Sequence, residues 1–347
     1  MPTSLAPVLR SAGSGAEGLH SGDDMKRLIF TTSDSGAGCL RQPGIADMVM
    51  PLGSRFFLGE PLPSDVEIAN ALEEDDWLGR IYRKYAQQTD RRTRTIDLCE
   101  PFDTVDLWID PDPNAQLILI WLLEYFRPHE AISKLNLVQA DVPIGSYPAE
   151  EAAEWRIPAV KILNEHLELA SSVWQAYRAP TPRDWFKLLS TDLSLLPLFR
   201  PAAVALLEEL PGLATGLGAT EMRMLELISE GNAGPYDVFP GHEKRNERRV
   251  FDYWQIGALL DGLARCPAPA VSGLDEGPFT DEMHDDRDRH QRYKRSRLAL
   301  TALGKAILAG REDFSRHNPI HRWWGGTELT SDRLWRWDVE NGVLIAP

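Results

Sequence analysis

The chain has 347 residues, of which 43% are hydrophobic and 26% charged, and its formal net charge is −15 at pH 7. This length is greater than a single hydrophobic core normally supports, so we expect two or three domains. The acidic balance argues against a general nucleic-acid binder, which needs a basic surface to release counterions, and against adhesion to an anionic membrane. The three cysteines form no CxxC pair, which fits a reducing compartment without a disulfide framework or a zinc knuckle.

The N-terminal segment, residues 1–25, is rich in Gly, Ser and Ala and lacks the apolar centre of a signal peptide. No apolar run elsewhere has the length that a transmembrane helix needs. We therefore predict a disordered tail over 1–25 and a cytoplasmic protein without a membrane partner.

Residues 26–148 alternate between strand and helix patterns. Apolar β-type runs predict strands over Arg27–Thr31, Asp47–Leu52, Thr104–Ile109 and Leu135–Ala140. Helical spacing predicts helices over Ser64–Gln88 and Asn114–Phe126. The second helix is apolar on nearly every side, so we expect it to be buried against the sheet. The alternation predicts an α/β domain of the Rossmann-like, three-layer type with a mainly parallel sheet.

The rest of the chain is predicted to be mostly helical. Residues 149–215 form an all-helical connector, with helices expected over Val160–Tyr177, Trp185–Leu189 and Ala202–Leu210. Residues 216–347 begin with helices over Glu221–Glu230, capped by Thr220, and Asp252–Arg265. Leu298–Leu308 then passes from a β-type stretch through Leu-Thr-x-x-Gly into a helix, which is typical of a winged helix-turn-helix domain. We predict a winged-helix-like domain with a Trp-rich C-terminal end.

A short polar loop follows the first strand and leads at once into a helix. It holds two serines, an acid and two glycines: Ser33, Asp34, Ser35, Gly36 and Gly38. At such a junction the loop amides and the helix N-terminus face ligands at the carboxyl edge of the sheet. The glycines would let the amides approach an anion, and the serines can donate hydrogen bonds. The alternative is that Asp34 or Ser35 only caps the helix.

Two acidic residues follow the third predicted strand. Asp110 and Asp112 lie two residues apart, so in an extended segment they point the same way, and Gln116 is within reach of the same crevice. Such carboxylates suit Mg²⁺, the candidate cofactor, or acid–base chemistry. Asp112 before Pro113 also has the pattern of a helix N-cap. Asp110 has no such structural role in this interpretation and is the stronger site candidate.

Three groups of residues occur in an order typical of a known family. They are 32–42 (TSDSGAGCLRQ), 105–117 (VDLWIDPDPNAQL), and a C-terminal group of Thr220-Glu221, Leu300–Gly304, Arg322–Gly326 and Trp335–Asp338. Together they resemble the bacterial family called domain of unknown function 1835, with its helical C-terminal companion domain. Relatives often carry an acid after the second strand, where this chain has Arg55. The resemblance therefore implies architecture and candidate positions, and it implies no reaction. Arg55 joins the candidate ligand-binding residues, because Asp34 repels a phosphate unless a metal or Arg55 intervenes.

The C-terminal part holds two further clusters. The basic run Arg287–Arg297, preceded by acids, is interpreted as a solvated loop, with a phosphate-contacting wing as the alternative. The helix Asp252–Arg265, which would read the DNA groove in a winged helix, offers only Arg265 as a basic side chain. We therefore expect a module that contacts a protein or is purely structural, and no DNA partner. The tryptophans at 323, 324, 335 and 337 are expected to form a packed end-cap on the winged helix, with a binding platform that includes Arg322 and Arg336 as the alternative.

Three functions compete. The leading hypothesis is a non-catalytic ligand-binding or regulatory protein, with a small anionic or nucleotide-type ligand at the strand ends and a protein partner at the winged helix. The first alternative is a metal-assisted enzyme that acts on a phosphorylated small molecule or nucleotide. The second is a winged-helix transcription regulator, against which the acidic charge argues.

Overall fold

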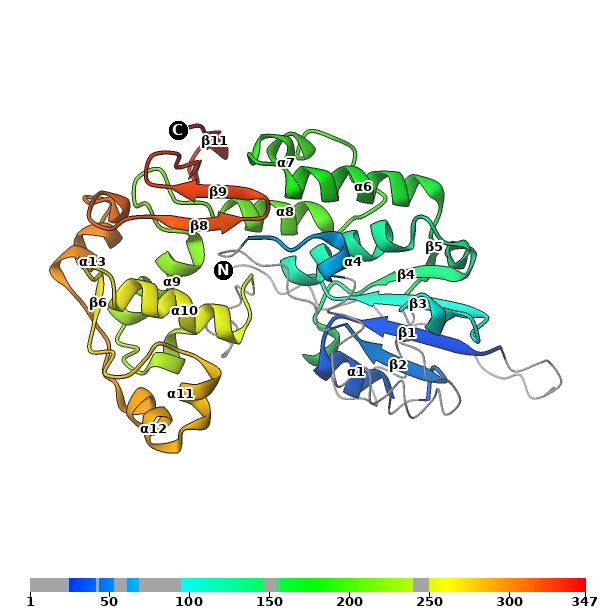
Figure 1. Cartoon of the computed structure of the whole chain (residues 1–347), viewed down its shortest axis with the longest axis horizontal. Coiled ribbons are helices and arrows are strands. Elements are labelled where there is room, and N and C mark those ends of the chain that lie inside the picture. The colour runs from blue at the N-terminus through cyan, green and yellow to red at the C-terminus, as the bar shows by residue number, and fades with distance from the viewer. Residues whose placement is uncertain are drawn as a thin grey trace, which may run out of the picture.

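The computed structural model describes residues 25–41, 44–52, 61–68, 95–146, 155, 157–239 and 250–347 (Figure 1). Most of the predicted tail, most of the predicted helix Ser64–Gln88, and Arg55 lie outside these ranges. Within the described ranges, no helix combines the length and apolarity needed to cross a membrane.

A mixed five-stranded sheet organises the N-terminal half (Figure 1). Its strands are β1 (Arg27–Thr31), β2 (Met48–Pro51), β3 (Thr104–Ile109), β4 (Leu135–Gln139) and β5 (Val160–Lys161). Their order across the sheet is β2-β1-β3-β4-β5, and only β5 pairs antiparallel with its neighbour. The α/β prediction is confirmed. The sheet is mixed rather than parallel because β5, which comes from the predicted connector, adds an antiparallel edge.

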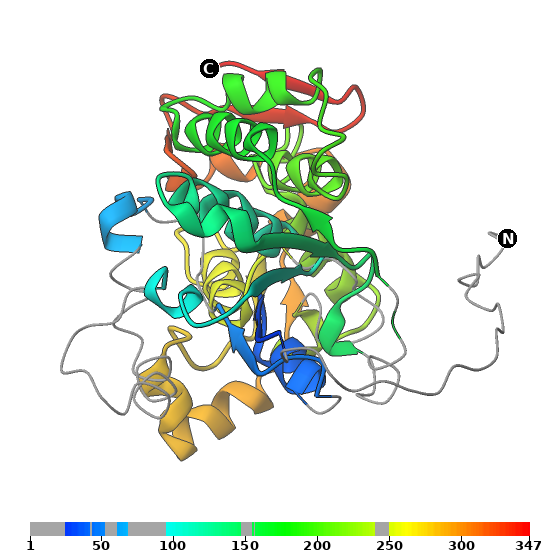
Figure 2. The same ribbon diagram turned by 90° about the vertical axis from the view of Figure 1, so that its right-hand side faces the viewer.

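The two faces of the sheet are covered by different helices. Helix α1 (Asp34–Arg41) lies on one face and α4 (Pro113–Phe126) on the other (Figure 2). Alternate residues of β1 therefore enter different cores: Ile29 packs with α1, whereas Leu28 and Phe30 pack with α4.

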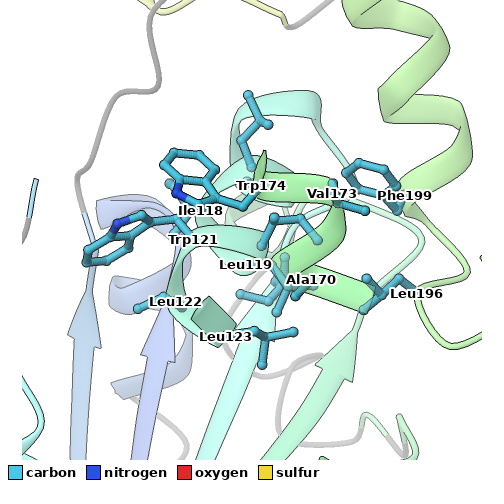
Figure 3. Close-up of a cluster of buried hydrophobic side chains, with 14 of the residues drawn as sticks. Ile118, Leu119, Trp121, Leu122, Leu123, Ala170, Val173, Trp174, Leu196 and Phe199 are labelled. Carbon is cyan, nitrogen blue, oxygen red and sulfur yellow. The ribbon is translucent and has the colours of Figure 1, made fainter. Parts of the chain in front are cut away.

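The connector contains α6 (Asn164–Arg178), α7 (Arg183–Leu188) and α8 (Phe199–Leu207). Helices α6 and α8 pack on the outer side of α4, and α7 packs on α6. Figure 3 shows Trp121 and Leu119 of α4 among side chains of α6 and Phe199 of α8. The predicted burial of α4 is confirmed, and one apolar core continues from the sheet into these helices.

The C-terminal part has a second core. Its elements are α9 (Ala219–Ser229), α10 (Tyr253–Ala264), β6 (Val271–Ser272), α11 (Asp281–Asp285), α12 (Arg287–Arg295), β7 (Ala299–Leu300) and α13 (Ala302–Leu308). The core is formed mainly by α9, α10 and α13 with the β6–β7 pair. The strands β8 (His321–Trp324), β9 (Thr327–Thr330), β10 (Arg336–Asp338) and β11 (Val343–Ile345) end the chain. The described residues also form short 3-10 helices: η1 (Asp97–Cys99), η2 (Glu130–Lys134), η3 (Ile144–Ser146), η4 (Pro235–Val238) and η5 (Phe314–Arg316).

Two local predictions for this part are wrong. The basic run is not a loop, because α12 covers Arg287–Arg295 and begins at an N-cap, Asp286, whose carboxylate accepts from two backbone N–H groups. Thr220 does not cap α9, which begins one residue earlier at Ala219. The Thr220 hydroxyl and N–H instead donate to the buried carboxylate of Glu209.

The C-terminal tryptophans pack on the connector helices rather than on the second core. Trp324 lies 5.5 Å from Tyr177 and 5.7 Å from Trp185, measured between ring centroids. Its indole N–H donates to the Leu206 carbonyl over 2.7 Å. The next residue, Gly325, has a φ of +53°, and a Cβ there would fall 2.4 Å from the Tyr177 carbonyl oxygen. The β8–β9 hairpin thus closes the main core, and this close approach requires glycine.

We expect Trp324→Ala to lower the free energy of unfolding by about 3–5 kcal/mol, because it empties a buried aromatic site and leaves the Leu206 carbonyl without its donor. The matched control is Trp323→Ala, the neighbouring residue on the opposite face of β8, which is partly exposed and should cost about 1 kcal/mol or less. Urea unfolding followed by circular dichroism measures both. Equal losses would show that the hairpin is not anchored through Trp324.

Candidate functional site

The strand order reverses between β1 and β3. The chain leaves β1 through α1 to reach β2 on one side, and it leaves β3 through α4 to reach β4 on the other side. Because β1 and β3 are parallel neighbours, their carboxyl ends meet at one edge of the sheet. In open α/β sheets, the crevice at such a reversal is where ligands bind. The predicted site residues of the first and third strand ends are therefore placed on adjacent strands.

Asp110 joins three loops at this edge. Its Oδ2 accepts from the hydroxyls of Thr32 at 3.4 Å and Ser33 at 3.3 Å, and its Oδ1 accepts from the Ile144 N–H at 2.7 Å. Only 4% of the residue is exposed. The expectation that Asp110 has no structural role is wrong, because its carboxylate ties the ends of β1 and β3 to η3.

Gln116 is fully buried and supports the same edge from within α4. Its amide nitrogen donates to the Asp110 carbonyl over 2.8 Å, and its amide oxygen accepts from the Gln139 amide over 3.2 Å. Gln116 therefore fixes the backbone at the end of β3, and the structure buries it away from solvent. Gln139, at the end of β4, was not predicted as part of the site.

The first turn of α1 differs from the predicted loop. The Ser33 hydroxyl accepts from the Gly36 N–H over 3.1 Å, so Ser33 caps the helix rather than Asp34 or Ser35. Gly36 and Gly38 lie inside the helix, so their amides do not form an open anion cradle. Asp34 and Ser35 are exposed at the start of α1.

The loop after β4 packs directly on this first turn. A Cβ on Gly145 of η3 would fall 2.2 Å from the Ser35 hydroxyl and 2.9 Å from the Gly36 nitrogen. Glycine is therefore required where η3 meets α1. The sequence interpretation missed Ile144 and Gly145, although the glycine that follows the fourth strand was a usable signal. Beneath the same turn, the Thr31 hydroxyl is buried and has no hydrogen-bond partner among the described residues.

Asp112 caps α4, as predicted. Its Oδ1 accepts from the Ala115 N–H over 3.0 Å, and Pro113 occupies the first helical position. Part of the residue reaches the surface. The dense protein around its carboxyl nonetheless raises the pKa of Asp112 to about 6, and the nearby Asp110 carboxylate adds to the rise.

The acids of this edge do not form a ready metal site. Within the described ranges, no three His, Cys, Asp or Glu side chains are grouped to hold a metal ion. Asp110 and Asp112 instead use carboxylate oxygens to accept protein N–H and O–H groups. Arg55 lies outside the described residues.

We expect Asp110→Ala to lower the free energy of unfolding by about 2–4 kcal/mol, because it leaves the buried Ile144 N–H without an acceptor and releases two hydroxyls. Asp110→Asn should cost less, since the amide oxygen still accepts from Ile144 while its NH₂ donates to Thr32 and Ser33. Asp141→Ala, at an exposed acid after β4, is the control and should change stability by about 0.5 kcal/mol or less. An Asp110→Ala protein as stable as this control would contradict the structural role.

Asp112 should give a pH dependence of stability. Its pKa in the folded protein, about 6, is above its ordinary value of 3.8, so the folded state binds this proton more tightly. The resulting stabilisation is present below about pH 4 and is lost as the pH rises through about 6, by up to about 3 kcal/mol. Asp112→Asn keeps a capping oxygen and should remove this decline between pH 4 and pH 6.

The companion variant separates the charge from the cap. Asp112→Ala also removes the decline, but it should be about 0.5–2 kcal/mol less stable than Asp112→Asn because the cap is lost. Urea unfolding of the three proteins over this pH range measures both effects. A decline that persists in Asp112→Asn would assign it to another group.

Comparison with known proteins adds little to this geometry. No family model matches the chain, and no curated protein matches it. Among solved structures, it is similar to the DNA-binding, cleavage and re-ligation domain of Plasmodium falciparum topoisomerase II, with 11% identity and a TM-score of 0.39. The match covers 96% of this chain and 58% of that one. A likeness at this level supports no functional conclusion.

Proposed function

We propose that the protein binds a small phosphorylated or nucleotide-type ligand at the sheet edge between β1 and β3, without turning it over. The observation that carries this proposal is the reversal of strand order at these two strands, with the loops on either side held together by Asp110. A Rossmann-like domain binds ligands at this position. A rigid edge also suits binding, because little order has to be imposed when the ligand arrives.

The polar groups at the edge define what such a ligand needs. The exposed start of α1 offers the Ser35 hydroxyl and the partial positive charge of a helix N-terminus. The carboxylates of Asp34 and Asp112 repel a bare phosphate. The ligand is therefore best accommodated together with a cation, and Mg²⁺ is the candidate that accompanies phosphates.

The C-terminal part is proposed to be a winged-helix module that contacts a protein. Helices α9 and α10, strand β7 and helix α13 follow one another in the order that the sequence predicted, and β7 pairs with a further strand, β6. The insertion of α11 and α12 between the paired strands replaces a simple wing. The resemblance to domain of unknown function 1835 and its companion domain would imply the same two-part arrangement.

One observation favours an enzyme as the second candidate. A carboxyl group with a pKa of about 6, such as that of Asp112, is suited to give or take a proton near neutral pH. Asp112 lies at the same edge as the proposed ligand. An enzyme acting on a phosphorylated substrate there would use Asp112 as its acid or base.

Binding of ATP, ADP, AMP and inorganic phosphate, each with and without MgCl₂, tests the proposal by thermal shift and calorimetry. We expect at least one Mg²⁺-containing probe to bind. Without Mg²⁺, Asp34→Asn should strengthen phosphate-probe binding about fivefold, because it removes a negative charge at the start of α1. Asp332→Asn makes the same charge change at an exposed site and should leave affinity unchanged.

Two results would contradict this function. If no probe binds and Asp34→Asn behaves like Asp332→Asn, the sheet edge is not a phosphate site. If a bound probe is turned over, and Asp112→Asn abolishes turnover while retaining binding, the enzyme is the correct function.

A further inference from the structure

Helix α12 and the residues after it carry a concentrated positive charge. Residues 287–297 hold six Lys and Arg and one Asp, a net charge of +5, which leaves −20 for the rest of a chain whose total is −15. The helix lies between the paired strands β6 and β7 in the chain and at the outer end of the C-terminal part (Figure 1). This charge is therefore presented at one protruding end of an otherwise acidic molecule.

The inner side of α12 is firmly attached to the protein. Glu276 pairs with Arg289 at 3.1 Å and with Arg292 at 2.7 Å. The hydrogen bond from Arg292 lowers the pKa of Glu276 to about 2, so this carboxylate is ionised at neutral pH. Tyr293 is fully buried, and Nε2 of His290 lies 2.9 Å from the Tyr236 hydroxyl. The helix is thus a rigid support for its outer side chains.

The outer side chains of α12 are left without acidic partners in the described part of the chain. Arg287, Gln291 and Arg295 are exposed and lie four residues apart, so they line one face of the helix. A hollow of about 580 Å³ is lined by Arg287, Asp288, Gln291, Arg292 and Arg295. Such a row of guanidinium groups matches anions that accept two parallel N–H bonds.

We propose that this outer face of α12, defined by Arg287, Gln291 and Arg295, binds a short acidic segment of a partner protein. Carboxylates spaced along a peptide would pair with the two arginines, and Gln291 would donate between them. This inference rests on the protein contact proposed above for the C-terminal part and states which kind of partner segment it would bind. It does not depend on a ligand at the sheet edge.

The surroundings of the face favour a short peptide over nucleic acid. A nine-residue helix extends about 13 Å, while charges act over about 8 Å at physiological ionic strength. Exposed acids of α11, Asp281, Glu282 and Asp285, lie just before α12. A long polyanion that continued past the helix would be repelled by these acids and by the net charge of −20 on the rest of the chain. A short acidic segment would contact the helix alone and avoid this repulsion.

The test uses the full chain and two labelled probes of equal charge: a peptide of eight glutamates and a single-stranded oligonucleotide with eight phosphates. Fluorescence anisotropy at about 50 and about 200 mM NaCl gives the affinities and their salt dependence. We expect the peptide to bind more tightly than the oligonucleotide, and the double variant Arg287→Ala/Arg295→Ala to bind it at least tenfold more weakly.

The matched control is Lys305→Ala/Arg311→Ala, which removes two exposed charges from another part of the same unit and should change peptide affinity less than twofold. Circular dichroism checks that both double variants are folded. Equal peptide affinities of the two double variants would overturn the proposal, as would tighter binding of the oligonucleotide. A salt-dependent dimer lost only in the α12 variant would identify a second copy as the occupant and would also overturn it. Because neither probe is a nucleotide ligand, these outcomes do not depend on the sheet-edge site.

Discussion

The rest of the structure depends on α4 having no polar face. Of its 14 residues, 11 are buried, so the helix is stable only if protein surrounds it. The sheet supplies one side, and α6 and α8 supply the other. This requirement explains why the helices after β5 share one core with the sheet. It also explains why the end of β3 is rigid, since α4 begins there and its first turn is fixed by Asp112.

The features predicted from the sequence are those set by local patterns. Apolar runs and helical spacing were enough for the first four strands and for α4, because these signals lie within the segments themselves. Strand β5 was missed, and its residues Val160 and Lys161 were assigned to the helix predicted over Val160–Tyr177, because a strand of two exposed residues carries no alternation of its own. Helix α12 was missed because a charged run without apolar spacing looks like a loop. It is held by the Asp286 cap, by the buried Tyr293 and by Glu276, which lies 13 residues before Arg289.

The candidate site was predicted in position but not in its bonds. Asp112 could be assigned from its neighbour Pro113, because a helix cap is a local feature. The role of Asp110 could not, because its strongest partner, the Ile144 N–H, lies 34 residues further along. Gly145 shows the same limit: its need to be glycine arises from α1, which only the folded sheet brings near it. A ligand would contact the exposed residues of this edge, Asp34 and Ser35, because the buried residues Asp110 and Gln116 form hydrogen bonds within the protein.

The β8–β9 hairpin gives the chain a demanding order of folding. Thr327 donates to the Ala179 carbonyl, 148 residues earlier, and Trp324 fills the space between Tyr177 and Trp185. During synthesis at about 5–20 residues per second, roughly 7–30 s pass between the two halves of this contact. During that interval the parts of Tyr177 and Trp185 that Trp324 covers in the folded protein lack this cover. Uncovered apolar surface of this kind favours aggregation, so the hairpin, although it comes late in the chain, protects a surface that is made early.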